Sequence, residues 1–275
     1  MVFYLVGLGL GDVTDITVKG LNINSPLQKK FNFENYTSLL SSGFDQTQLE
    51  KFYERPIIEA DREFVEQKIE KVLEESLNDD IALLIVGDPF GATTHSDLLI
   101  RAKQIGVSLK VIHNASILTA VGCTGLQLYN FGSTVSIPFW TDNWEPDSFF
   151  EKILINLNNG MHTLCLLDIK IKEQSLENIL RKRNEYEKPC FLTCSQAAKQ
   201  IIKIIERNKG NLVVNADIFV VGIARIGWDD QKIVYATLQQ LAFEVDMGLP
   251  LHSLIIPSFE LHPLEKEMLN SFIFK

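Results

Sequence analysis

The stretch IALLIVGDPFGATTH, residues 81–95, decides the fold class. It opens with an uninterrupted apolar run, which is typical of a strand buried on both faces of a parallel sheet. A turn with two glycines and a proline follows, and Thr94 or Ser96 then offers a side-chain oxygen that can cap a helix. A strand, a turn and a helix in this order form the repeating unit of an α/β protein.

Comparable apolar runs recur along the 275-residue chain. They predict strands at Val2–Gly9, Ile81–Gly87, Ser108–His113, Thr163–Asp168, Ile218–Gly222 and Leu251–Ile256. Helices are expected between them, with Asp61, Asp147 and Ser195 as N-terminal caps. We therefore predict two α/β domains, residues 1–114 and 115–275, of which the second contains a mixed sheet.

Composition narrows the range of functions. The formal net charge is −9, and an acidic chain gains nothing from phosphate contacts, which argues against general nucleic-acid binding. The four cysteines form no CxxC pair, which argues against zinc and suits a reducing cytosol. The apolar start, Val2–Leu10, lacks a basic leader, and no apolar run reaches the roughly 18 residues of a membrane span.

Two glycine-bearing turns are the candidate ligand loops. Gly7–Asp12 has the pattern GxGxG followed by aspartate, which departs from the dinucleotide fingerprint GxGxxG, and Asp12 would repel a pyrophosphate. A binding loop and a tight turn without a ligand both remain open there. In the second turn, Asp88 offers an acceptor and Gly91 leaves room for a ligand, although an ordinary Asp-Pro turn explains the same residues.

A set of short segments in a fixed order resembles the diphthine synthase family, which belongs to the tetrapyrrole-methylase fold group. These segments run nearly from end to end of the chain. They are YLVGLGLG (4–11) with DITVKGL (15–21), ENYTSL (34–39), GDPFGATTH (87–95), IHNASILTAVGCTGL (112–126), HTLCLLDIK (162–170), ARIG (224–227) and LHS (251–253). A single string of this length would carry little weight, whereas the ordered set is specific.

The resemblance implies two α/β domains of the tetrapyrrole-methylase type with a cofactor cleft between them, in a cytoplasmic homodimer. It implies a methyltransferase that uses S-adenosylmethionine, releases S-adenosylhomocysteine, and modifies a 3-amino-3-carboxypropyl-histidine on translation elongation factor 2. Matched motif by motif, the residues expected to bind the cofactor are Leu10, Asp88, Gly91, Ser116, Ile117, Leu167, Ile226 and His252.

Without the family, six of these eight residues have simpler interpretations. Four apolar ones would be core, Ser116 a helix cap, and His252 a polar residue satisfied between strands. No metal motif is present, and no residue is assigned as catalytic, although Asp168 and Glu34 are placed to accept the proton of the amine. The rival hypotheses are a tetrapyrrole methyltransferase of the same fold group and a non-catalytic binding module.

Two surfaces are expected to meet protein partners. The loop Pro138–Pro146 combines three large aromatic residues with two acids, and Trp144 is the aromatic residue most suited to contact the elongation factor. The late apolar residues are interpreted as a dimer interface rather than core, namely Phe259, Leu261, Leu264 and Met268.

Overall fold

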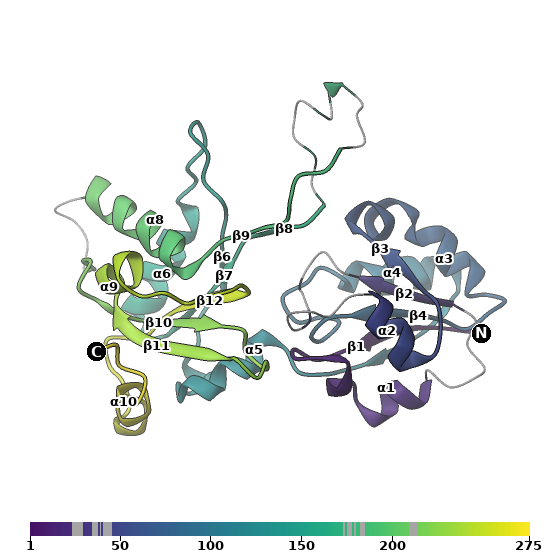
Figure 1. Ribbon diagram of the computed structural model, residues 1–275, viewed down its shortest axis with the longest axis horizontal. Helices are drawn as coiled ribbons and strands as arrows, with labels where there is room; N and C mark the ends of the chain where they lie inside the picture. The colour runs from purple at the N-terminus through teal and green to yellow at the C-terminus, as the bar shows by residue number, and fades with distance from the viewer. Residues whose placement is uncertain are drawn as a thin grey trace. The chain divides into compact units, whose positions relative to one another are not determined.

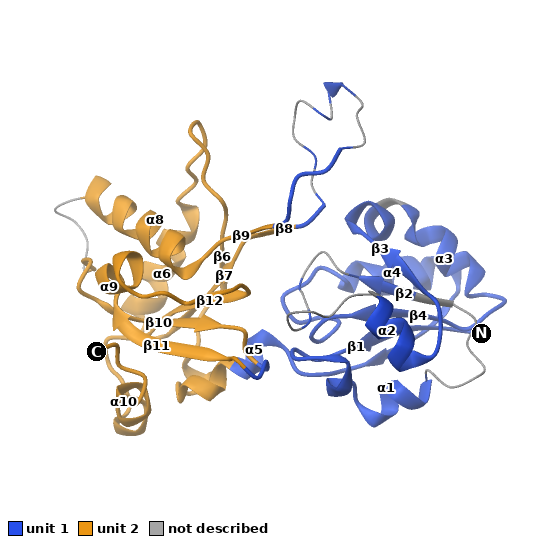
Figure 2. Cartoon of the chain, viewed as in Figure 1, with its two compact units in different colours: residues 1–120, 171–189, 227–229 blue, residues 121–170, 190–226, 230–275 orange. Residues whose placement is uncertain are grey.

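The structure is a computed structural model that describes residues 1–23, 30–34, 38, 40, 46–172, 174, 178, 180–181, 185–208 and 214–275. The chain forms two compact units (Figure 2). The first unit contains residues 1–120, 171–189 and 227–229, and the second contains residues 121–170, 190–226 and 230–275. The chain therefore passes from the first unit to the second near residue 120 and returns to the first unit twice.

The first unit is built on a five-stranded sheet in which every pair of neighbours is parallel (Figure 1). The order across the sheet is β3-β2-β4-β1-β5. The strands are β1 (Val2–Gly7), β2 (Lys30–Glu34), β3 (Ile57–Ala60), β4 (Ile81–Ile85) and β5 (Ser108–Ile112). The helices of this unit are α1 (Val18–Ile23), α2 (Gln46–Tyr53), α3 (Ile69–Glu75), α4 (Ser96–Ile105) and α5 (Ile117–Ala120).

The central strand β4 shows why the apolar runs are continuous. Ile81, Leu83 and Ile85 belong to a core cluster that includes residues of α3 and α4. Ala82 and Leu84, between them, belong to a second cluster that includes residues of α2. Successive side chains of a strand point to opposite faces, so a strand covered by helices on both faces must be apolar at every position.

The second unit contains a mixed five-stranded sheet in the order β11-β10-β12-β7-β6. Only β6 and β7 pair in parallel, and the other neighbours are antiparallel. The strands are β6 (Val135–Ile137), β7 (Thr163–Leu167), β10 (Phe219–Ala224), β11 (Lys232–Thr237) and β12 (His252–Ile256). The helices are α6 (Ser148–Asn158), α8 (Cys194–Arg207), α9 (Leu238–Phe243) and α10 (Pro263–Asn270), and β8 (Ile169–Lys170) pairs with β9 (Cys190–Phe191).

The structure confirms the α/β fold and corrects several details. The helix for which Ser195 was expected as the cap is capped by Thr193 instead. The Thr193 side chain accepts from the Gln196 N–H, and the Gln196 side chain accepts from the Thr193 N–H. The strand expected at residues 135–138 is present as β6, whereas the short strands β2, β3 and β11 were not predicted. Within ENYTSL, residues 35–37 and 39 lie outside the described residues. Among the described residues, no helix is long and apolar enough to cross a membrane.

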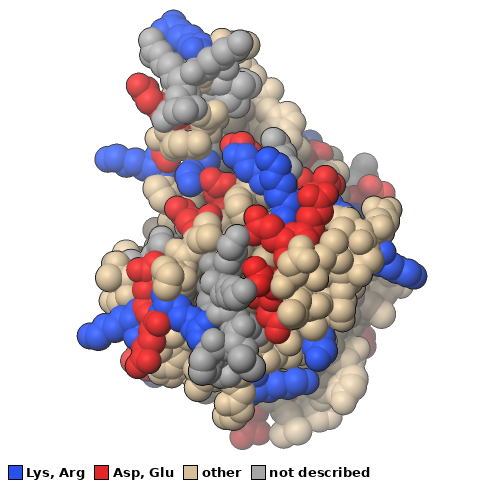
Figure 3. Space-filling view, turned by 90° about the vertical axis from the view of Figure 1, so that its right-hand side faces the viewer, with Lys and Arg blue, Asp and Glu red and all other residues tan. Residues whose placement is uncertain are grey.

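Acidic and basic side chains are mixed on the surface of the protein. On the face shown in Figure 3, Asp and Glu side chains are interspersed with Lys and Arg. No continuous basic surface is visible there among the described residues, whereas proteins that bind a phosphate backbone usually present one.

Candidate functional site

The turns after three neighbouring strands of the first unit meet at one edge of its sheet. β1 lies between β4 and β5, and all three are parallel, so their carboxyl ends share this edge. The backbones of Gly9 and Gly87 pair directly, with the Gly87 N–H 2.7 Å from the Gly9 oxygen. A side chain at Gly7 would place its Cβ 2.6 Å from the Gly87 oxygen, so this approach requires glycine.

Asp88 is an ionised acceptor at the centre of this edge. Its Oδ1 accepts from the Phe90 N–H at 2.9 Å, and its Oδ2 accepts from the Asn114 N–H at 3.0 Å and from His113 Nδ1 at 2.9 Å. Burial raises the pKa of Asp88, but the hydrogen bonds from Phe90, Asn114 and His113 outweigh burial, and the pKa lies below its usual value. The site therefore carries a fixed negative charge at neutral pH.

Asn114 joins the same turns and was not singled out from the sequence. Its Nδ2 donates to the carbonyls of Gly7 and Asp15, both at 3.0 Å, and its Oδ1 accepts from the Ala115 N–H at 2.7 Å. The available signal was a polar residue two positions after the end of β5.

Gly91 packs against Ser116. A Cβ at position 91 would lie 2.2 Å from the Ser116 Oγ and 2.6 Å from its Cβ. Ser116 is buried, and its Oγ accepts from the Leu118 N–H at 3.1 Å at the start of α5. Both interpretations of Ser116 are therefore compatible with its position: it binds the backbone of α5 and it lies at the edge where the predicted ligand loops meet.

Leu10 is tied to a distant part of the chain. The indole Nε1 of Trp228 donates to the Leu10 oxygen at 2.9 Å, and Gly227, beside it, lies close to Leu10 and Gly11. Five of the eight predicted residues lie in the first unit: Leu10, Asp88 and Gly91 on the turns that follow β1 and β4, and Ser116 and Ile117 at the start of α5, which follows β5.

The other three predicted residues gather at one end of the second sheet. Leu167 ends β7, His252 begins β12, and Ile226 follows β10, and these strands are neighbours in the order β10-β12-β7. Ala224 of β10 pairs with His252, and Leu166 of β7 pairs with Ser253. Leu167 and Ile226 are buried, as their alternative interpretation as core residues requires.

The ring of His252 is fully used by the protein backbone. Its Nδ1 accepts from the Cys194 N–H at 3.3 Å, so its Nε2 carries the proton and donates to the Leu249 oxygen at 2.9 Å. Burial lowers the pKa of His252, and the ring is neutral at pH 7. A ligand of this residue would meet its ring face or its backbone.

Arg225 is a buried cation that sequence reasoning missed. Its Nε donates to Asp230 Oδ2 at 2.7 Å, and its Nη1 donates to the carbonyls of Met247 and Leu249. Its φ of 53° lies in the left-handed region, which is costly for a residue other than glycine. Arg225 therefore fixes the loop before His252, and a charged residue at the end of the apolar strand β10 was the available signal.

The two carboxylates considered as proton acceptors differ in access. Glu34 ends β2 with a side chain that is 0% exposed, 3.3 Å from His95 Nε2. It cannot touch an amine on a protein substrate, and this hypothesis was wrong because the position of Glu34 in the sequence gave no measure of its burial. Asp168 is half-buried and follows Leu167, and its Oδ2 accepts from the Phe139 N–H at 3.2 Å.

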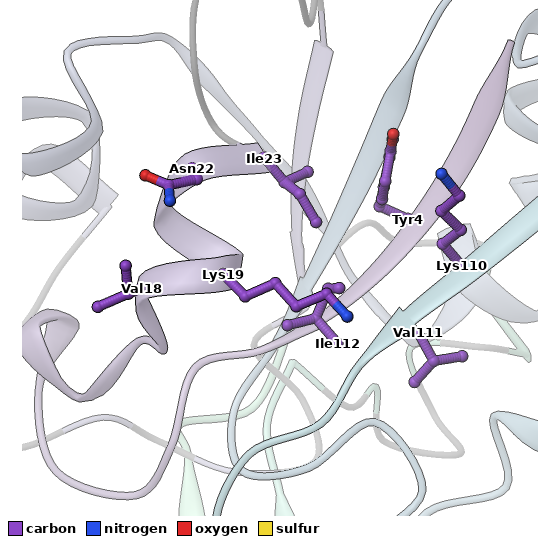
Figure 4. A pocket seen from close by; sticks show the side chains of 8 residues that line it. All are labelled: Tyr4, Val18, Lys19, Asn22, Ile23, Lys110, Val111 and Ile112. Carbon is purple, nitrogen blue, oxygen red and sulfur yellow. The ribbon is translucent and has the colours of Figure 1, made fainter.

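A separate pocket of about 580 Å³ lies in the first unit (Figure 4). It is lined by residues of α1, β1 and β5, with Lys19 and Lys110 among them, and by none of the eight predicted residues. In the described part of the chain, no group of three His, Cys, Asp or Glu residues is placed to hold a metal ion.

The chain is similar to known proteins over nearly its whole length. The family model of the tetrapyrrole (corrin/porphyrin) methylases matches residues 2–242. A diphthine methyl ester synthase of Bos taurus is 54% identical over 272 residues, which cover 98% of this chain and 94% of the relative. One of Dictyostelium discoideum is 50% identical over 275 residues, which cover 100% of this chain and 99% of the relative.

Solved structures agree with these matches. A crystal structure of diphthine synthase superposes with a TM-score of 0.82 and is 31% identical, covering 99% of this chain and 96% of the other. The order of the sheets, the turns at their edges and these similarities lead to one conclusion: the chain belongs to the tetrapyrrole (corrin/porphyrin) methylase family and, within it, to the group of the diphthine methyl ester synthases.

Proposed function

We propose that this protein is an S-adenosylmethionine-dependent methyltransferase that methylates the 3-amino-3-carboxypropyl-histidine intermediate on translation elongation factor 2, a step of diphthamide biosynthesis. Its support is the match to diphthine methyl ester synthases over 98% or more of the chain. Elongation factor 2 works in the cytoplasm, so the reaction belongs there.

The ionised carboxylate of Asp88 is the observation that carries the choice of cofactor. S-adenosylmethionine is a sulfonium that also bears an ammonium group, so a fixed negative charge suits it. The same charge disfavours a pyrophosphate, which counts against a module that binds dinucleotides. In the first unit, the residues that we assign to the cofactor are Leu10, Asp88, Gly91, Ser116 and Ile117. For the second unit, Leu167, Ile226 and His252 stay predictions from the sequence.

The reaction requires the protein mainly to position the two reactants and to exclude water. The bound sulfonium supplies a methyl group with a good leaving group, and correct orientation of two reactants is worth roughly 7–11 kcal/mol. The acceptor amine must be neutral when it attacks, so a group near it must take its proton. Asp168 is the candidate carboxylate whose side chain is accessible, and we assign it this task.

Recognition of the elongation factor is assigned to the loop after β6. The backbones of Thr141 and Trp144 pair across a tight turn, which leaves the Trp144 side chain 58% exposed. Trp140 is instead structural, because its indole donates to Pro146 and Lys203 lies over its ring.

Glu145 does not have the role expected of the acids in this loop. Its carboxylate forms ion pairs with Lys203 and Arg207 of α8, so its charge is neutralised within the chain. The partner-facing part of the loop is therefore reduced to Trp144 and Asp142, both of which are exposed.

Assembly into a homodimer is assigned to an apolar surface of the second unit. Phe259, Leu264 and Met268 are exposed, and Leu261 is half-buried. Tyr129, in a short 3-10 helix, is 98% exposed. Its segment is joined to α10 because the Gln127 N–H donates to Glu265 at 2.8 Å. Exposed apolar residues gathered in this way are typical of an interface between protein chains.

The decisive experiment starts from elongation factor 2 that carries the unmethylated intermediate. It is incubated with this protein and S-adenosylmethionine, and mass spectrometry follows the added methyl groups. We expect mass increments on that histidine only. Methylation of a tetrapyrrole in place of the elongation factor would favour the other branch of the family, and calorimetry without heat from S-adenosylhomocysteine at millimolar concentration would reject the enzyme.

A further inference from the structure

A buried histidine and a buried glutamate lie next to the loop that carries Asp88. Glu34 is 0% exposed and ends β2, while His95 is 3% exposed and directly precedes α4. His95 Nε2 lies 3.3 Å from Glu34 Oε2, and His95 Nδ1 lies 3.2 Å from the Pro89 oxygen. The mechanism proposed above uses neither residue.

The chemistry of the two contacts fixes where the protons are. The Pro89 carbonyl can only accept, so His95 Nδ1 must carry a hydrogen and donate. The other ring nitrogen faces a carboxylate, and two lone pairs facing each other in a buried place would be costly. One further proton therefore lies between His95 Nε2 and Glu34, and the ring has only one orientation that satisfies both neighbours.

The Pro89 carbonyl connects this pair to the proposed cofactor loop. The peptide unit between Pro89 and Phe90 is planar, so holding its C=O also holds its N–H on the opposite side. That N–H, of Phe90, donates to Asp88 Oδ1 at 2.9 Å. The Thr93 hydroxyl donates to the same Pro89 oxygen at 2.9 Å, so both lone pairs of the carbonyl are used. A rotation of this peptide would remove a hydrogen bond from Asp88.

Backbone strain in the same loop shows that it needs such support. Ala92 has a φ of 60°, in the left-handed region, although it has a side chain. Such a residue is held in place only where its surroundings determine the conformation. His95 and Thr93 are the residues after Ala92 that contact the Pro89 oxygen.

We propose that Glu34 and His95 form a positioning pair that orients the Asp88 carboxylate toward its ligand through the Pro89–Phe90 peptide. This inference rests on the proposed function, because Asp88 is there assigned to the cofactor. The two residues touch no substrate. Glu34 holds the ring of His95, His95 holds the peptide, and the peptide holds Asp88.

Three conservative variants separate the two contacts of His95. In His95→Asn the amide takes the place of Nδ1 and keeps a donor for Pro89, whereas in His95→Gln the amide reaches the place of Nε2 and keeps only the contact with Glu34. Glu34→Gln keeps both contacts, because its amide donates to a neutral His95. The matched control is His162→Gln, which alters another buried histidine, 3.1 Å from Glu265 in the second unit.

Calorimetry with S-adenosylhomocysteine and thermal unfolding are measured on each variant. Because one oriented hydrogen bond behind a charged group is lost, we expect His95→Gln to weaken binding about tenfold. His95→Asn and Glu34→Gln should stay within about threefold of the unaltered protein. All three substitutions of histidine should lower the melting temperature, and His162→Gln should do so without a change in binding.

The outcomes separate this proposal from the proposed function. If His95→Asn and His95→Gln lose binding equally, the positioning role is overturned. The same holds if the loss of binding in each variant is proportional to its loss of melting temperature, because a purely structural pair would behave in that way. In both cases binding by the unaltered protein would still support the proposed function. Failure of the unaltered protein to bind S-adenosylhomocysteine would overturn both.

Discussion

Substitution of Gly91 tests whether the ligand loops are as tightly joined as the structure shows. In Gly91→Ala, the new Cβ would lie 2.2 Å from the Ser116 Oγ and 2.6 Å from the Ser116 Cβ. The hydroxyl can rotate away, but the Cβ of Ser116 moves only with its backbone. Overpacking of this kind typically costs about 1–3 kcal/mol. If the strain falls on the ligand-bound state, it corresponds to about 5- to 150-fold weaker binding.

A double-mutant cycle with Ser116→Gly identifies the cause of this loss. Glycine at position 116 removes both atoms that the new Cβ would meet, so Gly91→Ala with Ser116→Gly should bind S-adenosylhomocysteine better than the sum of the single effects predicts. Calorimetry gives the four dissociation constants, and circular dichroism checks the fold. Additive effects would show that residue 91 meets the cofactor itself, and normal binding by Gly91→Ala would show that neither contact matters.

Three further predictions address the partner surfaces and the core. Trp144→Ala should lower methylation of elongation factor 2 while S-adenosylhomocysteine affinity and melting temperature stay unchanged; a drop in melting temperature, as expected for Trp140→Ala, would make Trp144 structural. In sedimentation, the unaltered protein should be a dimer of about twice the chain mass of 31.2 kDa, and Leu264→Lys should be a monomer. If the unaltered protein is itself a monomer, the proposed interface is rejected. Burial raises the pKa of Glu265, but hydrogen bonds from Gln127, His262 and His162 outweigh burial, and the pKa lies below the ordinary value of 4.5. The ionised carboxylate therefore stabilises the fold above that pH, and this stabilisation is lost as the pH falls through the lowered pKa. Glu265→Gln should therefore be less stable at pH 7 and lose less stability on acidification, and identical acid unfolding curves would contradict this.

Strands that are buried on both faces could be predicted from the sequence, whereas several of the short ones could not. The run Ile81–Val86 is apolar at every position because helices cover both sides of β4. By contrast, β3 is only four residues long and β11 alternates between buried and more exposed positions, so neither stands out as a long apolar run, whereas β5 was predicted although its residues alternate between exposed and half-buried. Tertiary pairing sets such strands, and it leaves a weak trace in the sequence.

The positions of the loop residues could be predicted in part for the same reason, whereas their role in binding a ligand stays a prediction. Glycine and aspartate after a buried strand indicated Asp88 and Gly91, because ligands of α/β sheets lie beyond the carboxyl ends of the strands. The parts that depend on contacts between distant residues could not be derived: the hydrogen bonds of Asn114, the buried guanidinium of Arg225 and the burial of Glu34. Thr193 was missed as a cap because Ser195, two residues later, is an equally good side chain for that role.

The hydrogen bond between Trp228 and Leu10 has a consequence for how the protein is made. The two residues are 218 positions apart in the chain. At a translation rate of about 5–20 residues per second, Trp228 is synthesised roughly ten to forty seconds after Leu10. During that interval the glycine-rich turn after β1 lacks the indole that holds it. A nascent chain cut short before residue 228 should therefore contain all five strands of the first parallel sheet but not the indole that holds the turn after β1.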